Sequence, residues 1–258
     1  MPSRTDTYFL SDLHLGARYA GDVHAAERRV CRFLDAISPT AKRIFLVGDV
    51  LDYWYEYRYA VPRGFVRFFG KLAELSDSGV EITWLIGNHD IWIFDYLPAE
   101  LGITVADGNL VTEIEGRKFF ISHGDAQDDS SRSFRLMRTL FRNRFCQRLY
   151  AAIHPRWTIP FALGWSRHSR ASGSEDDVPK PDRLVDFGRR YLRRHPDIAF
   201  FIFGHLHILE DIALPPDSRV IILGDWLSHF SYARYHGQEL TIHTYREEDS
   251  DSAPAALI

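Results

Sequence analysis

Short apolar runs alternate with amphipathic segments in the first part of the chain. Apolar runs of about four to eight residues bounded by polar turns are typical of buried strands, and apolar residues spaced three and four apart are typical of helices. We therefore expect strands at 7–11, 43–47 and 80–86, and helices at 21–36 and 65–78. Because strands and helices alternate, the pattern predicts an α/β core whose functional site lies at the carboxyl ends of the strands.

Beyond Pro98 the apolar runs become shorter, and a long segment with helical spacing interrupts them. Further strands are predicted at 104–105, 110–114, 117–122, 198–203, 219–223 and 240–245, and a further helix at 184–194. We divide the chain accordingly into a core formed by residues 1–129 and 175–247, a helical, arginine-rich insertion at 130–174, and a disordered tail at 248–258.

Composition excludes several classes of protein. With 258 residues, 45% hydrophobic and 26% charged, the chain has an ordinary globular composition. Its apolar runs fall short of the roughly 18 residues that a membrane-spanning helix needs. The chain enters its first strand without a secretory signal, so a cytoplasmic protein is expected. The two cysteines, Cys31 and Cys146, lack the spacing of a thiolate metal site or a disulfide framework.

The net charge of −4 conceals a strongly cationic segment. Nine arginines and no acidic residue lie between Ser130 and Arg170, which leaves 22 of the 31 basic residues against all 35 acidic ones elsewhere. Such a separation of charge indicates a partner rather than a requirement of the fold.

The same segment carries a stripe of large apolar residues at helical spacing. Its members are Phe134, Met137, Phe141, Phe145 and Leu149. Two interpretations fit the stripe. A helical hairpin could pack it onto the core and leave the arginines in solvent. Alternatively, a lid could offer apolar surface to acyl chains and guanidinium groups to phosphates or to an anionic membrane surface.

Five predicted strands each end in oxygen or imidazole side chains. Taken alone, any one of them could be an ordinary hydrogen-bonded residue of the core, but five such junctions at one edge of the sheet favour a metal centre. The candidate ligands are Asp12, His14, Asp49, Asn88, His123, His205 and His207. Without a thiolate, this set suits Mn2+, Fe2+ or Zn2+, and its oxygen share favours Mn2+. Seven ligands exceed one tetrahedral site but fit two octahedral ions about 3.5–4 Å apart that share a carboxylate.

The order of these motifs resembles the calcineurin-type metallophosphoesterases. The motifs are Asp-x-His, Gly-Asp-x-x-Asp, Gly-Asn-His-Asp, His-Gly-Asp and Gly-His-x-His, between residues 8 and 207. The resemblance implies a four-layer αββα sandwich of the α/β (α+β) class. By the same resemblance, one ion is held by Asp12, His14 and His207, the other by Asn88, His123 and His205, and both by Asp49. It also implies that His89 serves as general acid or electrostatic stabiliser, oriented by Asp90; alternatively, His89 only packs beside the ligands.

Taken as a whole, the chain also resembles the UDP-2,3-diacylglucosamine pyrophosphatases of lipid A biosynthesis. Further features shared with them are Gly48-Asp49-Val50-Leu51-Asp52-Tyr53-Trp54, the helical insertion, and Leu223-Gly224-Asp225-Trp226. The resemblance implies hydrolysis at the α-phosphorus to UMP and 2,3-diacylglucosamine 1-phosphate, with Mn2+, by a protein peripheral on the inner face of the cytoplasmic membrane. It implies substrate contacts from Asn88, Arg132, Arg167, Ser169 and Arg170, each of the last four being equally readable as a surface residue.

One position departs from the best-known branch of that family. The branch has Gly-Asn-Arg-Asp where this chain has Gly-Asn-His-Asp, so His89 replaces a fixed cation with a side chain that titrates near pH 7.

Two other functions compete with this interpretation. A nuclease or cyclic-nucleotide phosphodiesterase would also use a basic, aromatic segment. However, the aromatic residues lie at helical spacing with Leu and Met, which favours a continuous apolar face, and no nucleic-acid partner is expected. A scaffold without metals should have lost ligands, whereas all seven are present. No obligate protein partner is indicated.

Overall fold

The computed structural model describes residues 4–128, 132–171 and 180–247, apart from the side chains at 132–134 and 165–171. Two mixed β-sheets form the centre of the molecule. The six-stranded sheet has the order β11-β10-β1-β2-β3-β4, with bounds Glu239–Thr244, Ser231–His236, Asp6–Leu10, Ala41–Val47, Glu81–Leu85 and Thr104–Ala106. The five-stranded sheet has the order β5-β6-β7-β9-β8, with bounds Leu110–Ile114, Arg117–Ile121, Ile198–Phe203, Ser218–Leu223 and Leu209–Leu214.

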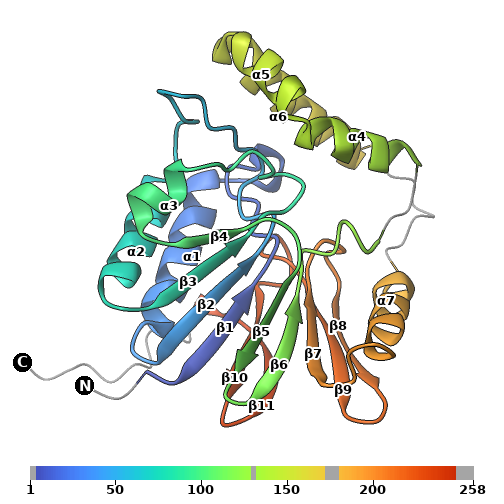
Figure 1. Ribbon diagram of the computed structural model, residues 1–258. Coiled ribbons are helices and arrows are strands. Elements are labelled where there is room, and N and C mark those ends of the chain that lie inside the picture. The colour runs from blue at the N-terminus through green and yellow to red at the C-terminus, as the bar shows by residue number, and fades with distance from the viewer. Residues whose placement is uncertain (1–3, 129–131, 172–179, 248–258) are drawn as a thin grey trace, which may run out of the picture.

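Helices cover the outer face of each sheet, which gives four layers (Figure 1). Helices α1 (Val23–Ile37), α2 (Val66–Asp77) and α3 (Tyr96–Leu101) pack on the six-stranded sheet, and α7 (Asp182–Leu192) packs on the other. Between the sheets lies an aromatic core that includes Phe9, Phe45, Phe119, Phe200 and Tyr235. The predicted αββα sandwich is therefore confirmed.

The central strands of both sheets run parallel, so their carboxyl ends lie together. Strands β1, β2 and β3 are parallel neighbours in one sheet, and β6, β7 and β9 in the other. In Figure 1 these ends point toward the side on which the inserted helices lie. The fold thus places five polar loops at one edge of the sandwich.

Strands β8 and β10 and the short helix α3 were missing from the sequence-based prediction. Strand β10 inserts between β1 and β11, and its inward positions are Ser231, Ala233 and Tyr235, which form no apolar run. Strand β8 is an exposed edge strand that carries Glu210 and Asp211. Strand β8 pairs with the adjacent β9 at the exposed edge of its sheet, and β10 pairs with β1 from the start of the chain as well as with the adjacent β11. Neither strand needs an apolar run of its own, so the local pattern was a poor guide.

The insertion contains three helices, α4 (Arg132–Arg142), α5 (Arg144–Ala152) and α6 (Pro155–Ala171). Asn143 separates α4 from α5, because its side chain accepts hydrogen bonds from the backbone N–H groups of Phe145 and Cys146 and so caps a new helix. The predicted single apolar stripe is wrong for this reason. Phe141 packs against the core, whereas Phe145 is 68% exposed. Among the described residues, no helix combines the length and apolarity needed to cross a bilayer.

Candidate metal centre

The strand-end loops hold most of the candidate ligands in a left-handed backbone conformation. Five of them have positive φ angles: Asp12 (54°), His14 (43°), Asp49 (51°), His205 (70°) and His207 (54°). Such angles are uncommon outside glycine, although Asp and His tolerate them better than most residues. They turn each chain sharply where its strand ends, so that the side chains converge on one point. Strain of this kind is characteristic of functional sites.

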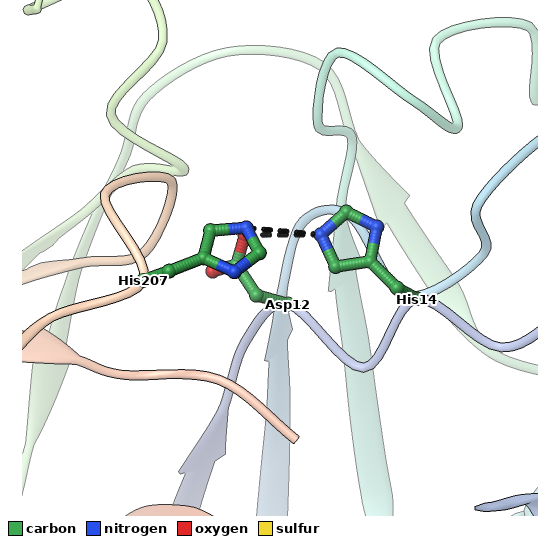
Figure 2. A group of neighbouring side chains, drawn as sticks. All are labelled: Asp12, His14 and His207. Carbon is green, nitrogen blue, oxygen red and sulfur yellow. Dashed lines mark hydrogen bonds and ion pairs between the residues drawn. The ribbon is translucent and has the colours of Figure 1, made fainter. Parts of the chain in front are cut away.

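Asp12, His14 and His207 form the first group of converging side chains (Figure 2). The Nε2 atoms of His14 and His207 lie 3.1 Å apart, and Asp12 Oδ1 lies 3.6 Å and 3.3 Å from them. Asp12 Oδ1 is buried and has no hydrogen-bond partner. Its other oxygen accepts hydrogen bonds from Ser11 and from the backbone N–H of His205. A buried carboxylate oxygen facing two imidazole nitrogens fits a divalent cation.

Asp49, His123 and His205 form the second group. Asp49 Oδ2 lies 3.3 Å from His123 Nε2 and 3.9 Å from His14 Nε2, so this one oxygen faces both groups. Asn88 Oδ1 lies 3.2 Å from His123 Nε2. All seven predicted ligands therefore meet in one centre, with Asp49 placed where a shared ligand would lie.

The ionisable side chains of the second group shift one another's pKa values. Burial raises the pKa of Asp49, but the charges of His123 and His89 outweigh burial, so its pKa lies well below the usual value. Burial lowers the pKa of His123, but Asp49 outweighs burial and the pKa lies well above the usual value. Burial and the charge of His123 lower the pKa of His205 to about 4. His205 is therefore neutral near pH 7, in the form that binds metals.

Contacts on the far side of three of the imidazoles favour one nitrogen facing the centre. His123 Nδ1 lies 3.0 Å from the carbonyl oxygen of Val47, and His207 Nδ1 lies 3.2 Å from Asp225 Oδ2. His14 Nδ1 lies 3.5 Å from Asp52 Oδ1. In each case Nδ1 faces an oxygen that accepts hydrogen bonds, and Nε2 is directed inward, which favours the form that offers Nε2 to a cation. Asp52 and Asp225 were not predicted as site residues, although both lie in motifs quoted for the family resemblances.

Glycines make room for this arrangement. A Cβ on Gly48, whose φ is +80°, would lie 2.5 Å from His123 Nδ1. A Cβ on Gly87 would lie 2.2 Å from Asp49 Oδ1. The glycine that precedes each of these two ligand motifs is thus required by the side chain that passes over it.

His89 lies at the rim of the centre. Its Nδ1 is 3.0 Å from the carbonyl oxygen of Asp52, its Nε2 is 4.0 Å from Asp49 Oδ2, and its backbone N–H donates to Asp49 Oδ1. The expectation that Asp90 orients this ring is wrong. Asp90 is fully buried and accepts hydrogen bonds from the N–H groups of Val50 and Gly87 and from Trp84 Nε1. It joins the two ligand loops, and Asp52 takes the position beside His89.

The remaining predicted substrate contacts fall on side chains outside the described ones. Arg132 lies in α4, and Arg167, Ser169 and Arg170 lie in α6. Their roles remain predictions from the sequence.

The insertion is attached to the loops that carry the ligands. Tyr53 Oη lies 3.0 Å from Tyr150 Oη, and Tyr55 Oη donates to the carbonyl oxygen of Gln147 at 2.7 Å. After His89, Trp92 donates from Nε1 to the carbonyl oxygen of Phe141 at 2.9 Å, and its ring stacks on Tyr150 at 5.0 Å.

A third ligand loop reaches the insertion through an ion pair. After His123, Asp125 lies 2.7 Å from Arg138 of α4. The loops after β2, β3 and β6 thus each continue from a candidate ligand into a contact with the inserted helices.

Comparison with known proteins gives a consistent result. The model of the calcineurin-like phosphoesterases matches residues 7–209. The UDP-2,3-diacylglucosamine hydrolase of Porphyromonas gingivalis is 44% identical over 259 residues, which cover 95% of this chain and 99% of that protein. A protein of the same name from Edwardsiella ictaluri is 27% identical over 251 residues, covering 94% and 95%.

Two solved structures are similar in outline. The Escherichia coli phosphoesterase Yfce matches with a TM-score of 0.44 at 15% identity and 93% coverage of both chains. Vacuolar protein sorting 29 of Cryptosporidium parvum matches with a TM-score of 0.48 at 13% identity, covering 94% of this chain and 92% of that one.

Proposed function

The chain belongs to the calcineurin-like phosphoesterase family, and on that basis we propose that it hydrolyses UDP-2,3-diacylglucosamine to UMP and 2,3-diacylglucosamine 1-phosphate. The proposed substrate rests on the 44% identity to a UDP-2,3-diacylglucosamine hydrolase across 95% of this chain and 99% of that protein. Such coverage includes the insertion as well as the core. The proposed reaction is attack by water at the α-phosphorus, in a step of lipid A biosynthesis.

The proposed cofactor is a pair of divalent cations, with Mn2+ as the preferred ion. Asp12, His14 and His207 would hold one, Asn88, His123 and His205 the other, and Asp49 both. When bound, the ions supply Lewis-acid polarisation of the phosphate and acidify a water molecule. His89, whose Nδ1 lies against the Asp52 carbonyl, presents Nε2 to the same side and would stabilise or protonate the departing phosphate oxygen.

A cavity at the junction of the core and the insertion supports an acylated substrate. It has a volume of about 610 Å³ and lies between the core and the insertion. Its apolar wall includes Ile91 and Ile93, which lie two and four residues after His89, and its charged wall includes Arg142, Arg144 and Arg148. An apolar wall next to guanidinium groups is suited to a lipid that carries a phosphate group.

The outer side of the insertion supports attachment to an anionic membrane surface. Its exposed large apolar residues are Leu136, Leu140, Phe145, Leu149, Ile153, Trp157 and Phe161. They lie among the arginines of the cationic segment, which contains no acidic residue. Apolar side chains that enter the headgroup region and arginines that bind anionic lipids are the two components of peripheral binding. The proposed site of action is the inner face of the cytoplasmic membrane.

The first experiment is turnover of UDP-2,3-diacylglucosamine with Mn2+ in mild detergent, with UMP and the lipid monophosphate followed by mass spectrometry. Bis(p-nitrophenyl) phosphate serves as a generic diester. UMP release far above the generic rate is expected. Cleavage of the generic diester without UMP release would retain the metal centre but refute the lipid substrate, and would favour the nuclease or cyclic-nucleotide phosphodiesterase alternative.

Membrane attachment is tested by sedimentation with vesicles. The protein should bind vesicles containing anionic phospholipid more strongly than purely zwitterionic ones. Replacement of Trp157 and Phe161, which are 68% and 66% exposed, by serine should weaken binding. Tyr59→Ser is the matched control, because Tyr59 is 88% exposed but lies outside the insertion. Equal loss in the control would rule out the insertion as the attachment surface.

A further inference from the structure

Asp225 lies in the connection between β9 and β10, far in sequence from the ligands of the first group. Gly224, with φ +74°, turns the chain immediately after β9, and a Cβ there would lie 2.4 Å from Ser231 Oγ. The turn brings residues 225 and 226 against the loop after β1. The backbone N–H of Trp226 donates to the carbonyl oxygen of Asp12 at 3.1 Å, so this connection is tied directly to a candidate ligand.

The two oxygens of the Asp225 carboxylate have different partners. Oδ1 accepts from the backbone N–H groups of Leu227, Ser228 and His229, at 3.1, 2.7 and 3.0 Å. Ser228 Oγ contacts both oxygens, and His229 Nδ1 lies 3.4 Å from Oδ1. Oδ2 is directed at His207 Nδ1, at 3.2 Å. The turn thus holds the carboxylate mainly by Oδ1, with Ser228 Oγ also reaching Oδ2, and places Oδ2 against the imidazole.

His207 is the ligand of its group that most needs such support. The side chains of Asp12 and His14 are 0% exposed, whereas that of His207 is 26% exposed. Surrounding atoms therefore enclose the first two, whereas the His207 ring is partly open to solvent and stacks on His14 at 4.9 Å. The contact of Nδ1 with Asp225 holds one edge of the ring, while Nε2 on the other edge faces Asp12 Oδ1, 3.3 Å away.

We propose that Asp225 is the positioning residue of the first ion site. It keeps the proton of His207 on Nδ1, fixes the ring, and increases the electron density that Nε2 offers to a cation. Carboxylate partners of this kind typically change metal affinity or activity by about 10–100-fold when removed. The proposal rests on the proposed metal-dependent hydrolase function, but it concerns metal binding and not the identity of the substrate.

The experiment measures Mn2+ stoichiometry and affinity by competition with a chromophoric chelator, for the wild type, Asp225→Asn and Asp225→Ala. One of two bound ions should bind about 10–100-fold more weakly in both variants, and the other should be unaffected. Asp217→Asn is the control, since Asp217 is exposed in the β8–β9 turn, away from the centre. Affinity for both ions within about twofold of the wild type in Asp225→Ala would overturn the proposal.

A double-mutant cycle separates positioning from a general structural role. In a His207→Ala background, Asp225→Asn should have almost no further effect on Mn2+ affinity, because its target is missing. A persistent loss would show that Asp225 acts only by holding its own turn. Turnover of the generic diester by Asp225→Asn should fall in kcat with little change in KM, and excess Mn2+ should restore it. Failure to cleave the lipid would refute the proposed substrate but leave these metal measurements valid.

Discussion

The ion pair between Arg138 and Asp125 should control how tightly the insertion is docked on the core. The Asp125 carboxylate is only 5% exposed, whereas the Arg138 side chain is 29% exposed. Although the charged atoms lie 2.7 Å apart, Arg138 Nε and Asp125 Oδ2 are not aligned as a hydrogen bond, so their attraction is mainly coulombic. Replacing Arg138 by Met keeps most of the length of the side chain and removes the charge.

The unequal burial of the two partners determines the size of the effect. Arg138→Met leaves a nearly buried carboxylate without its cation, and undocking of the insertion would return that carboxylate to water. Exposed pairs contribute about 0–1 kcal/mol, and breaking fully buried pairs costs about 3–5 kcal/mol. For this half-buried pair we expect about 1–3 kcal/mol, or roughly 5–150-fold in the undocking equilibrium. Asp125→Asn should cost less, because Arg138 can turn toward water.

Amide hydrogen exchange in residues 135–164 at fixed Mn2+ measures this equilibrium. Exchange there should be fastest in Arg138→Met, intermediate in Asp125→Asn, and slower in the double variant than in Arg138→Met alone. Arg156→Met is the control, since Arg156 is an exposed arginine of the same insertion. The reasoning is refuted if Asp125→Asn loosens the helices as much as Arg138→Met, or if the double variant is no slower than Arg138→Met.

Three further outcomes are expected. Gly48→Ala should weaken Mn2+ binding at least about tenfold, because its Cβ would lie 2.5 Å from His123 Nδ1. Gly79→Ala is the control: Gly79 is also at positive φ, but no atom lies within 4 Å of its Cβ position, so the variant should only lower the free energy of unfolding by about 1–2 kcal/mol. Asp49→Ala should reduce turnover by more than about 100-fold and lower the Mn2+ stoichiometry. This loss is larger than the loss caused by removing a residue that only hydrogen-bonds to a ligand. Near-normal turnover would contradict a shared ligand. Burial, with Tyr57 and Tyr150 nearby, raises the pKa of Tyr55 to about 12. The free energy that its hydrogen bond to Gln147 contributes to folding should therefore be complete below about pH 10, and it should be lost as the pH rises through about 12. The tyrosinate absorbance of the wild type minus that of Tyr55→Phe should titrate near pH 12, and a difference that titrates near pH 10 would contradict the bond.

The sequence alone was sufficient to predict that the candidate ligands lie together, because their signal is local. Each lies within four residues of the end of a strand whose apolar run is visible in the sequence, as at Asp12 after β1 or Asn88 after β3. Parallel strands in one sheet end at one edge, so the chemistry of each loop and its place could be predicted together.

The interactions around those ligands depended on contacts that no local pattern reports. Asp90 follows His89 directly, yet its carboxylate faces the loop after β2, and Asp52 takes its expected place. Asp225 reaches His207 only because β9 and β7 are neighbours and Gly224 turns the chain back. In the insertion, helical spacing correctly predicted helices, but the cap at Asn143 starts a new helix and so interrupts the apolar stripe. As a result Phe141 packs against the core, whereas Phe145 is exposed.

The sequence by itself determined the order along the chain of the strands that carry the candidate ligands, the oxygen and imidazole chemistry of those side chains, and the presence of a cationic helical insertion. These properties follow from residue type and short spacing, which the chain retains whether folded or not. Only the tertiary structure decided which imidazole nitrogen faces the centre, which carboxylate orients each ring, and how the insertion is held by Tyr53, Tyr55, Trp92 and Asp125. Those choices arise from packing between segments far apart in the chain, because a hydrogen bond or ion pair needs its partner within a few ångströms in space and not in sequence.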